Sequence, residues 1–125
     1  MSFTIAAEDR VQDWVVGNST TAPTGPMKLA ILTANGTESA AGTEVTGGSY
    51  ARQTITLSAS SGGAQSNSAD ITFTGMPACT VTGWALYDSA GTPFRWRYGA
   101  LVAPKDVNSG DDFVIAAGDL DLTLD

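Results

Sequence analysis

Hydrophobic and polar positions alternate along several short stretches of this 125-residue chain. In the clearest of them, residues 50–57, one face would carry Tyr50, Arg52, Thr54 and Thr56 and the other Ala51, Gln53, Ile55 and Leu57. Because strand side chains point to opposite faces in turn, the pattern predicts a strand with one wet and one dry side. Gly47 and Gly48 precede it and indicate a flexible corner.

Six further stretches have the length and composition of strands, namely residues 27–33, 69–74, 79–87, 94–101, 113–116 and 120–124. The first is almost wholly apolar, which favours a strand covered on both sides. Segments 34–45 and 58–68 are polar and are expected to be loops, the second of them mobile. About seven short strands of this kind predict a mainly β fold, an antiparallel sandwich or small jelly-roll-like barrel.

The stretch 94–101 is rich in aromatic residues. Strict alternation would put three aromatic side chains on one face and two arginines on the other, with Phe94, Trp96 and Tyr98 opposite Arg95 and Arg97. Residues 88–93, which precede it, have the composition of a hairpin turn.

Residues 4–17 predict a short N-terminal helix. Thr4 or Ser2 could cap its start, and Gly17 is placed to end it. A narrow apolar stripe follows helical spacing at Val11, Trp14 and Val15. We expect this stripe to pack on the body of the domain, with packing on a neighbouring subunit as the alternative.

The length fits one domain, with a helix at residues 4–17, a linker at 18–26 that contains two prolines, and a β body at 27–125. Six basic and 13 acidic residues give a net charge of −7, which disfavours nucleic-acid binding. The sequence shows no signal peptide and no apolar run long enough for a membrane span, so we expect synthesis in the cytoplasm and no membrane partner.

Candidate chemistry is sparse. The chain has no histidine, which removes the commonest general base and metal ligand, and we expect no enzyme activity and no cofactor. Four C-terminal carboxylates could bind a hard cation, but Asp111, Asp112, Asp119 and Asp121 match no calcium-loop spacing. A sugar-stacking platform could form from Trp84, Trp96 and Tyr98, although core or subunit contacts are the favoured interpretation.

Several segments carry a family resemblance, in the same order along most of the chain: residues 42–53 (GTEVTGGSYARQ), 67–73 (NSADITF), 84–88 (WALYD), 98–105 (YGALVAPK) and 107–125. They resemble a family of small bacteriophage structural proteins usually labelled tail fibre proteins. The resemblance implies no catalytic residues. A tail fibre normally needs an elongated trimeric shaft, and the chain has no repeat to build one. In size and composition it also resembles capsid decoration proteins.

We therefore expect a non-enzymatic structural protein of the phage particle, made in the bacterial cytoplasm. The first hypothesis is a decoration or cement protein that stabilises the head by binding the major capsid protein as a homo-oligomer, with a trimer favoured. The alternative is a tail fibre or tail-tip component that contacts tail proteins and host-surface glycans. The residues predicted to contact a partner are Trp14, Gly47, Gly48, Tyr50, Trp96 and Tyr98.

Overall fold

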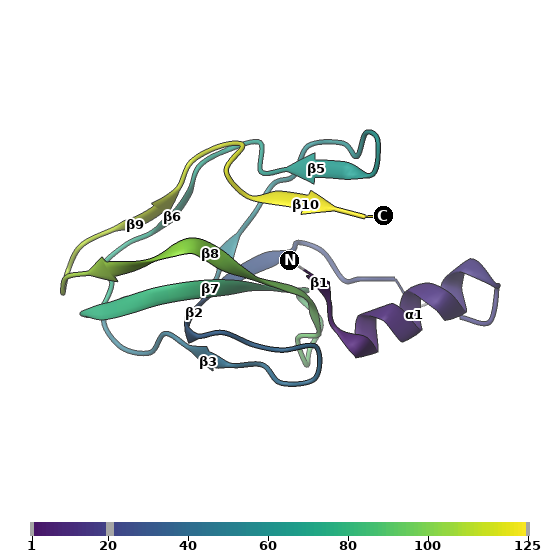
Figure 1. Ribbon diagram of the computed structural model, residues 1–125, viewed down its shortest axis with the longest axis horizontal. Helices are drawn as coiled ribbons and strands as arrows, with labels where there is room; N and C mark the ends of the chain where they lie inside the picture. Colours follow the sequence, from purple (N-terminus) through teal and green to yellow (C-terminus); the bar gives the residue numbers. More distant parts are fainter. Residues whose placement is uncertain (1, 20–21, 125) are drawn as a thin grey trace.

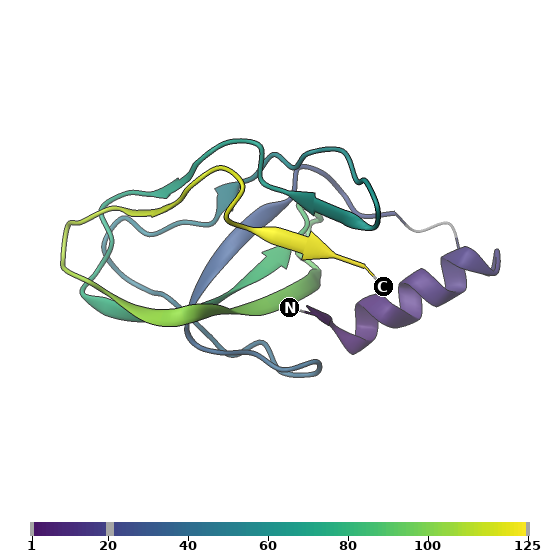
Figure 2. The same ribbon diagram turned by 45° about the horizontal axis from the view of Figure 1, so that its top comes forward.

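One antiparallel sheet forms a layer of the molecule, and two short two-stranded sheets face it (Figure 1 and Figure 2). The computed structural model describes residues 2–19 and 22–124. The main sheet has the order β1 (Ser2–Phe3), β8 (Arg95–Val107), β7 (Cys79–Tyr87), β2 (Lys28–Ala34) and β3 (Thr43–Glu44), with β4 (Gln53–Thr54) also paired to β2. The facing sheets pair β10 (Asp121–Thr123) with β5 (Ala64–Ser66), and β6 (Ile71–Phe73) with β9 (Phe113–Ile115).

The layers enclose a single hydrophobic cluster. Its members come from both layers and include Leu29, Ile31, Phe73, Val81, Trp84, Leu86, Phe113, Ile115 and Leu122. At the centre lies the Phe73 ring, fully buried, 5.9 Å from the ring of Tyr50 and 6.2 Å from that of Phe113. The predicted mainly β sandwich is confirmed. Across the described residues the sheets stay open and do not close into a barrel.

Strand β2 is buried on both faces, as its apolar sequence predicts. Leu29 and Ile31 point into the core cluster, whereas Ala30 and Leu32 are equally buried on the opposite face. The segment after β2 contributes to that second cover, because Asn35 lies against Gly83 of β7 so closely that a Cβ at position 83 would come within 2.3 Å of its Oδ1. The sheet therefore has a thin second layer made of a loop.

A buried amide fastens the facing layer. The side chain of Asn67 is 2% exposed and donates to the carbonyl oxygens of Ala69 and Ala116, each at 2.9 Å. Its Oδ1 accepts from the backbone N–H groups of Gly118 and Leu120 at 3.1 and 2.9 Å. The side chain thus adds to the backbone hydrogen bonds that join Asn67 to Gly118 and Leu120 in the turn between β9 and β10.

Several sequence-based boundaries are wrong. The segment 34–45, predicted to be a loop, contains β3, and the strand predicted at residues 94–101 continues to Val107. The segment 58–68, predicted to be a loop, contains β5. This strand pairs with β10, with Gln65 opposite Leu122. In the segment 50–57, regular pairing covers only β4. The Ser- and Gly-rich composition of residues 58–68 and the alternation of residues 50–57 are properties of each segment alone. Whether a segment forms a strand also depends on the strand available to pair with it.

A second error concerns the faces of β8. Tyr87 pairs with Arg95 and Leu86 pairs with Arg97, so the intervening Trp96 is an extra residue that shifts the register. Arg97 therefore turns inward and is 7% exposed, with its Nη2 donating to the Thr123 carbonyl at 2.6 Å. The predicted separation of three aromatic residues from two arginines does not hold, because a bulge reverses the alternation beyond it.

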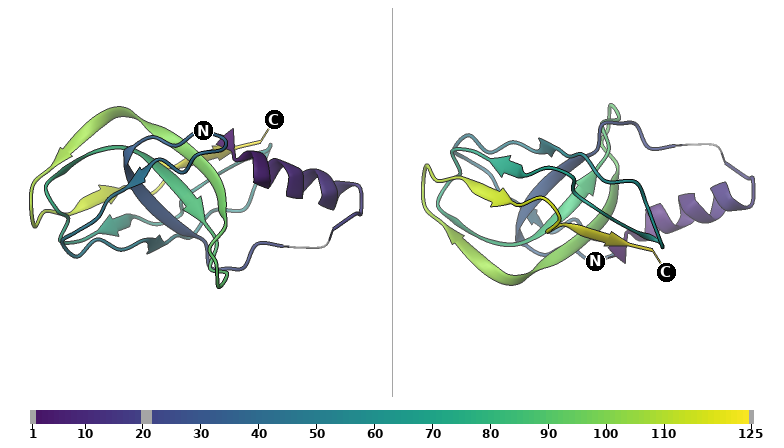
Figure 3. Two further views of the ribbon diagram at one scale, coloured as in Figure 1. Left: turned by 90° about the horizontal axis from the view of Figure 1, so that it is seen from below. Right: turned by 90° about the horizontal axis from the view of Figure 1, so that it is seen from above.

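The N-terminal helix α1 (Ile5–Val15) begins and ends at the residues that the sequence predicted as its caps. Thr4 is the N-cap, and its hydroxyl accepts a hydrogen bond from the backbone N–H of Ala7 at 3.1 Å. Gly17 follows the helix with φ +80°, a conformation that favours glycine. The expected packing of the apolar stripe is wrong for Trp14 and Val15, which are exposed, whereas Val11 is half-buried. The outer half of the helix projects beyond the end of the sheet (Figure 1 and Figure 3).

Candidate interaction arm and groove

The first half of α1 is anchored to the main sheet. The hydroxyl of Thr4, 3% exposed, donates to the backbone carbonyl of Arg95 at 2.9 Å, and its N–H donates to the carbonyl of Trp96 at 3.1 Å. Among the residues of α1, all of which are described, Ala7 is the buried one. A small residue at this point lets the helix backbone approach β8 closely.

Arg10 joins the middle of the helix to the body. Its guanidinium carbon lies 3.6 Å from the centre of the Phe94 ring and 5.5 Å from that of Trp96. The two rings pack edge to face at 4.8 Å. Arg10 therefore covers an aromatic pair with its planar cation, an arrangement that guanidinium groups favour.

Beyond Arg10, the helix projects past the end of the sheet (Figure 1), although Val11 is still half-buried. We call residues 11–17 the arm. Three of its apolar side chains are largely exposed: Trp14 at 64%, Val15 at 67% and Val16 at 66%. Trp14 lies seven residues after Ala7 and so lies on the same face of the helix, which continues past the edge of the body. The face that packs at its start is therefore uncovered at its end.

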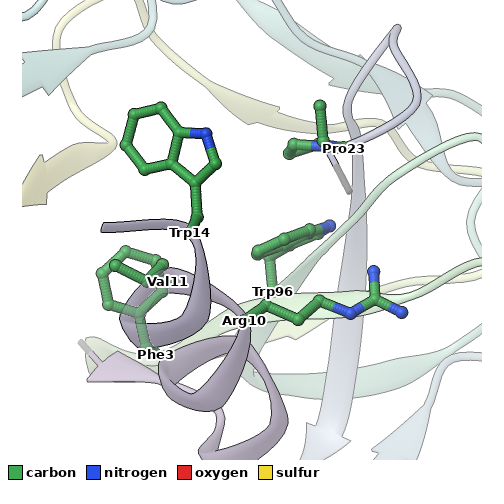
Figure 4. A pocket seen from close by; sticks show the side chains of 7 residues that line it. Phe3, Arg10, Val11, Trp14, Pro23 and Trp96 are labelled. Carbon is green, nitrogen blue, oxygen red and sulfur yellow. The ribbon is translucent and has the colours of Figure 1, made fainter. Parts of the chain in front are cut away.

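A groove opens between the arm and the body (Figure 4). Its volume is about 330 Å³, and its lining consists of Phe3, Arg10, Val11, Trp14, Ala22, Pro23 and Trp96. In Figure 4, Trp14 stands on one side and Pro23 on the other, with the ring of Trp96 below and between them. The groove therefore combines the exposed indole of the arm with the buried indole of β8.

Asp88 holds the body side of this groove in place. Its carboxylate, 3% exposed, accepts from the backbone N–H of Phe94 at 2.8 Å and from the indole N–H of Trp96 at 3.4 Å. It also accepts from the N–H of Thr24, which ties the linker to the hairpin. Burial alone would raise the pKa of Asp88, but these hydrogen bonds favour the carboxylate and lower the pKa below its usual value.

The charges of α1 are unevenly placed. Glu8, Asp9 and Asp13 are all exposed, and the helix has Arg10 as its one basic residue. Glu8, in the first turn, is favourable for the helix dipole, but the last turn of this fully described helix holds Asp13 and no base. Negative charge at a helix C-terminus disfavours the helix by about 0.3–1 kcal/mol. Asp13 thus makes the end of the helix acidic and lowers the stability of the helix.

The other predicted contact residues lie elsewhere. Gly47 and Gly48 form a turn with φ of +104° and +56°, and a Cβ at Gly48 would come within 2.5 Å of the Gly75 carbonyl oxygen. In Figure 1 this segment, just after β3, lies at the end of the body away from α1. Tyr98 is half-buried on β8, beside Ser2 of β1. The structure thus brings Trp14 and Trp96 together and separates them from the glycine corner.

Tyr50 points inward instead of lying on a wet face. Its hydroxyl donates to Oε2 of Glu44 at 2.7 Å and accepts from the N–H of Ile31 at 3.0 Å. Arg52 adds a two-point ion pair to Glu44, with both N···O distances close to 3 Å: 3.0 Å from Nε and 2.9 Å from Nη2. Burial raises the pKa of Tyr50, while the bonds from Arg52 and Tyr50 overcome burial and lower the pKa of Glu44.

The aromatic trio considered for sugar stacking does not form an exposed platform. Trp84 is 5% exposed and Trp96 is 7% exposed, and the Trp84 ring lies so close to Gly99 that a Cβ there would come within 2.7 Å of it. The C-terminal carboxylates likewise form no cation site, since the described residues contain no group of three or more potential ligands. No described helix is long and apolar enough to cross a membrane.

One comparison with known proteins is informative. The family model described as podophage GP4 fiber I protein gp80 matches residues 2–123. The chain belongs to this family. A comparison with curated proteins finds no match.

Membership in this fibre family confirms the resemblance to small phage structural proteins and supports a structural role in the phage particle. Of the two hypotheses drawn from the sequence, it supports the fibre component better than the capsid decoration protein. The matched residues include α1 as well as the β body.

Sequence reasoning found the two tryptophans of the groove but missed Phe3, Arg10 and Pro23. The spacing of Ala7, Val11 and Trp14 along one helix face could have indicated that this face is continuous. Nothing local could indicate that the linker returns past Trp96, because that path depends on the hydrogen bonds to Asp88.

Proposed function

We propose that this protein is a non-enzymatic component of a phage tail fibre, joined to its neighbours through the arm end of the molecule. The family match over residues 2–123 carries this proposal. The arm supports it, because exposed Trp and Val side chains beside an aromatic groove are typical of protein–protein contact surfaces. The main sheet, with its thin loop cover, would serve as a rigid mount for that surface.

This protein would be attached to a fibre and would not itself form the fibre shaft. Its β body is a two-layered unit with a single core, and its strands do not repeat along an axis. A homo-oligomer, with a trimer favoured, remains a prediction. Light scattering of the purified protein would determine the number of copies.

Gold-labelled antibody against this protein, viewed on intact phage particles, would test the proposal. We expect label on the tail. Label spread over the head would instead support a capsid decoration protein, and absence of label from particles that package DNA normally would argue against any role in the finished virion.

A further inference from the structure

The outer end of α1 is largely exposed, and among the described residues no ion pair forms with its carboxylates. Trp14 and Val16 are 64% and 66% exposed, and the groove under Trp14 is open. Asp13 lies in the last helical turn, where it opposes the helix dipole. Residues that break a local stability rule are expected where a molecule makes a contact.

We propose that the arm and its groove dock a basic segment of another protein of the phage particle, with an apolar side chain of that segment seated under Trp14. The proposal rests on the fibre role proposed above and adds the chemistry of the partner. The partner is defined by two features, an apolar tip and flanking Lys or Arg residues.

The apolar tip follows from the lining of the groove. Phe3, Trp14, Pro23 and Trp96 present rings, and Arg10 is already engaged with Phe94 at 3.6 Å. With a volume of about 330 Å³, the groove can admit a whole side chain, since one water occupies about 30 Å³ in the liquid. An apolar side chain would gain contact with both indoles, and the N–H of Trp96 would keep its bond to Asp88.

The flanking bases follow from the acids of the helix. With 3.6 residues per turn, Asp13 and Val15 lie about 100° to either side of Trp14. Asp9 is four residues from Asp13 and shares its side, and Glu8 is seven residues from Val15 and shares the other. Asp13 on one side and Glu8 on the other are exposed beside the groove face, where Lys or Arg of a partner could reach them, whereas Asp9 lies further round the helix.

The same charges disfavour a second copy of this chain as the occupant. Each copy has 13 acidic and 6 basic residues, and the arm contains no base, since Arg10, the one basic residue of α1, lies before it. Two arms brought together would place like charges side by side, which opposes association. A basic partner carries charge opposite to that of the helix and would be attracted to it at long range.

The probe is phage particles that lack this protein, titrated with fluorescently labelled full-length protein at 50 and 300 mM NaCl. We expect saturable binding of the wild type that weakens at least tenfold at the higher salt. Trp14→Ala and Asp13→Lys should each weaken binding at 50 mM NaCl at least tenfold, and Asp13→Lys should also reduce the salt dependence. Circular dichroism of each variant establishes that the fold is retained.

Matched controls lie on the body. Asp119→Lys makes the same charge change in an exposed turn, and Val114→Ala removes an exposed apolar side chain from β9. Both should bind within twofold of the wild type. If the controls weaken binding as much as the arm variants, or if the arm variants bind normally, the docking proposal is wrong.

Two outcomes separate this proposal from the fibre role. Tail label together with normal binding by the arm variants would refute the docking surface and leave the fibre role standing. Head label together with arm-dependent binding would refute the fibre role alone. Self-association of the wild type in sedimentation that is lost in Trp14→Ala would identify a second copy as the occupant and overturn the basic partner.

Discussion

The β body and the arm differ in what covers their apolar side chains. In the body, Phe73 lies between two layers and touches two further rings. In the arm, Trp14 lies on the same helix face as the buried Ala7 but is 64% exposed. The outer part of α1 projects beyond the end of the sheet (Figure 1). Hydrophobicity alone therefore does not say what a residue contributes, since one ring stabilises the fold and the other is free for a partner.

The largest expected contrast is between truncations of these two rings. Phe73→Ala should lower the free energy of unfolding by about 3–5 kcal/mol, because it removes a fully buried ring and leaves a cavity. Trp14→Ala should change it by about 0.5 kcal/mol or less, as expected for an exposed site. Urea denaturation of both variants measures the difference. Equal losses would mean that the arm is part of the core.

The glycine corner, far from the arm, tests a different part of the body. Gly48→Ala should cost about 2–4 kcal/mol, because it combines a positive φ with a Cβ placed against the Gly75 carbonyl oxygen. Gly62, with φ +61° and open space around it, is the matched control, and Gly62→Ala should cost about 1–2 kcal/mol for the backbone alone. Thermal or urea unfolding would show the gap. Similar costs at both positions would contradict tight packing at the corner.

Acid pH should weaken the body through Glu44. The pKa of Glu44 is lowered in the folded protein, so its contribution is present above the unfolded value near 4 and is lost as pH falls through the folded value. Glu44→Gln should therefore remove up to about 1 kcal/mol of the stability lost between pH 5 and pH 2. Unfolding free energies measured across that range test this. An unchanged pH dependence in the variant would mean that the ion pair with Arg52 does not form.

The smallest effect sharpens the same comparison by spectroscopy. The chain has three tryptophans, of which Trp14 is 64% exposed while Trp84 and Trp96 are 5% and 7% exposed. Iodide should quench the emission of Trp14 and leave that of the other two nearly unchanged. Trp14→Phe should therefore abolish most of the quenching in folded protein. Strong residual quenching would show that a tryptophan of the body is open to solvent.

The sequence was informative wherever one segment determines its own structure. Thr4 and Gly17 predicted the ends of the helix, and the apolar run of β2 predicted burial on both faces. The sequence did not predict those strands and turns whose conformation depends on residues far away in the chain. The polar segment around Gln65 becomes a strand because Leu122 lies opposite it. A bulge at Trp96, set by pairing with β7, reverses the faces of Arg97 and Tyr98.

The candidate site shows the same limit. Trp14 and Trp96 were predicted as contacts from their chemistry, but Gly48 and Tyr50 were predicted with them and lie within internal contacts of the body. The helical stripe correctly indicated an apolar face at Trp14. It could not say that the helix would leave the sheet, because the direction of the helix is set by the bonds of Thr4 to β8.

An image reconstruction of the phage particle would decide where this protein lies and which of its surfaces makes contact. We expect density for this fold on the tail, with the arm buried against a neighbouring protein and a basic segment of that protein at the groove between Trp14 and Trp96. Density on the capsid lattice, or on the tail with the arm exposed to solvent and the β body making the contacts, would contradict this expectation.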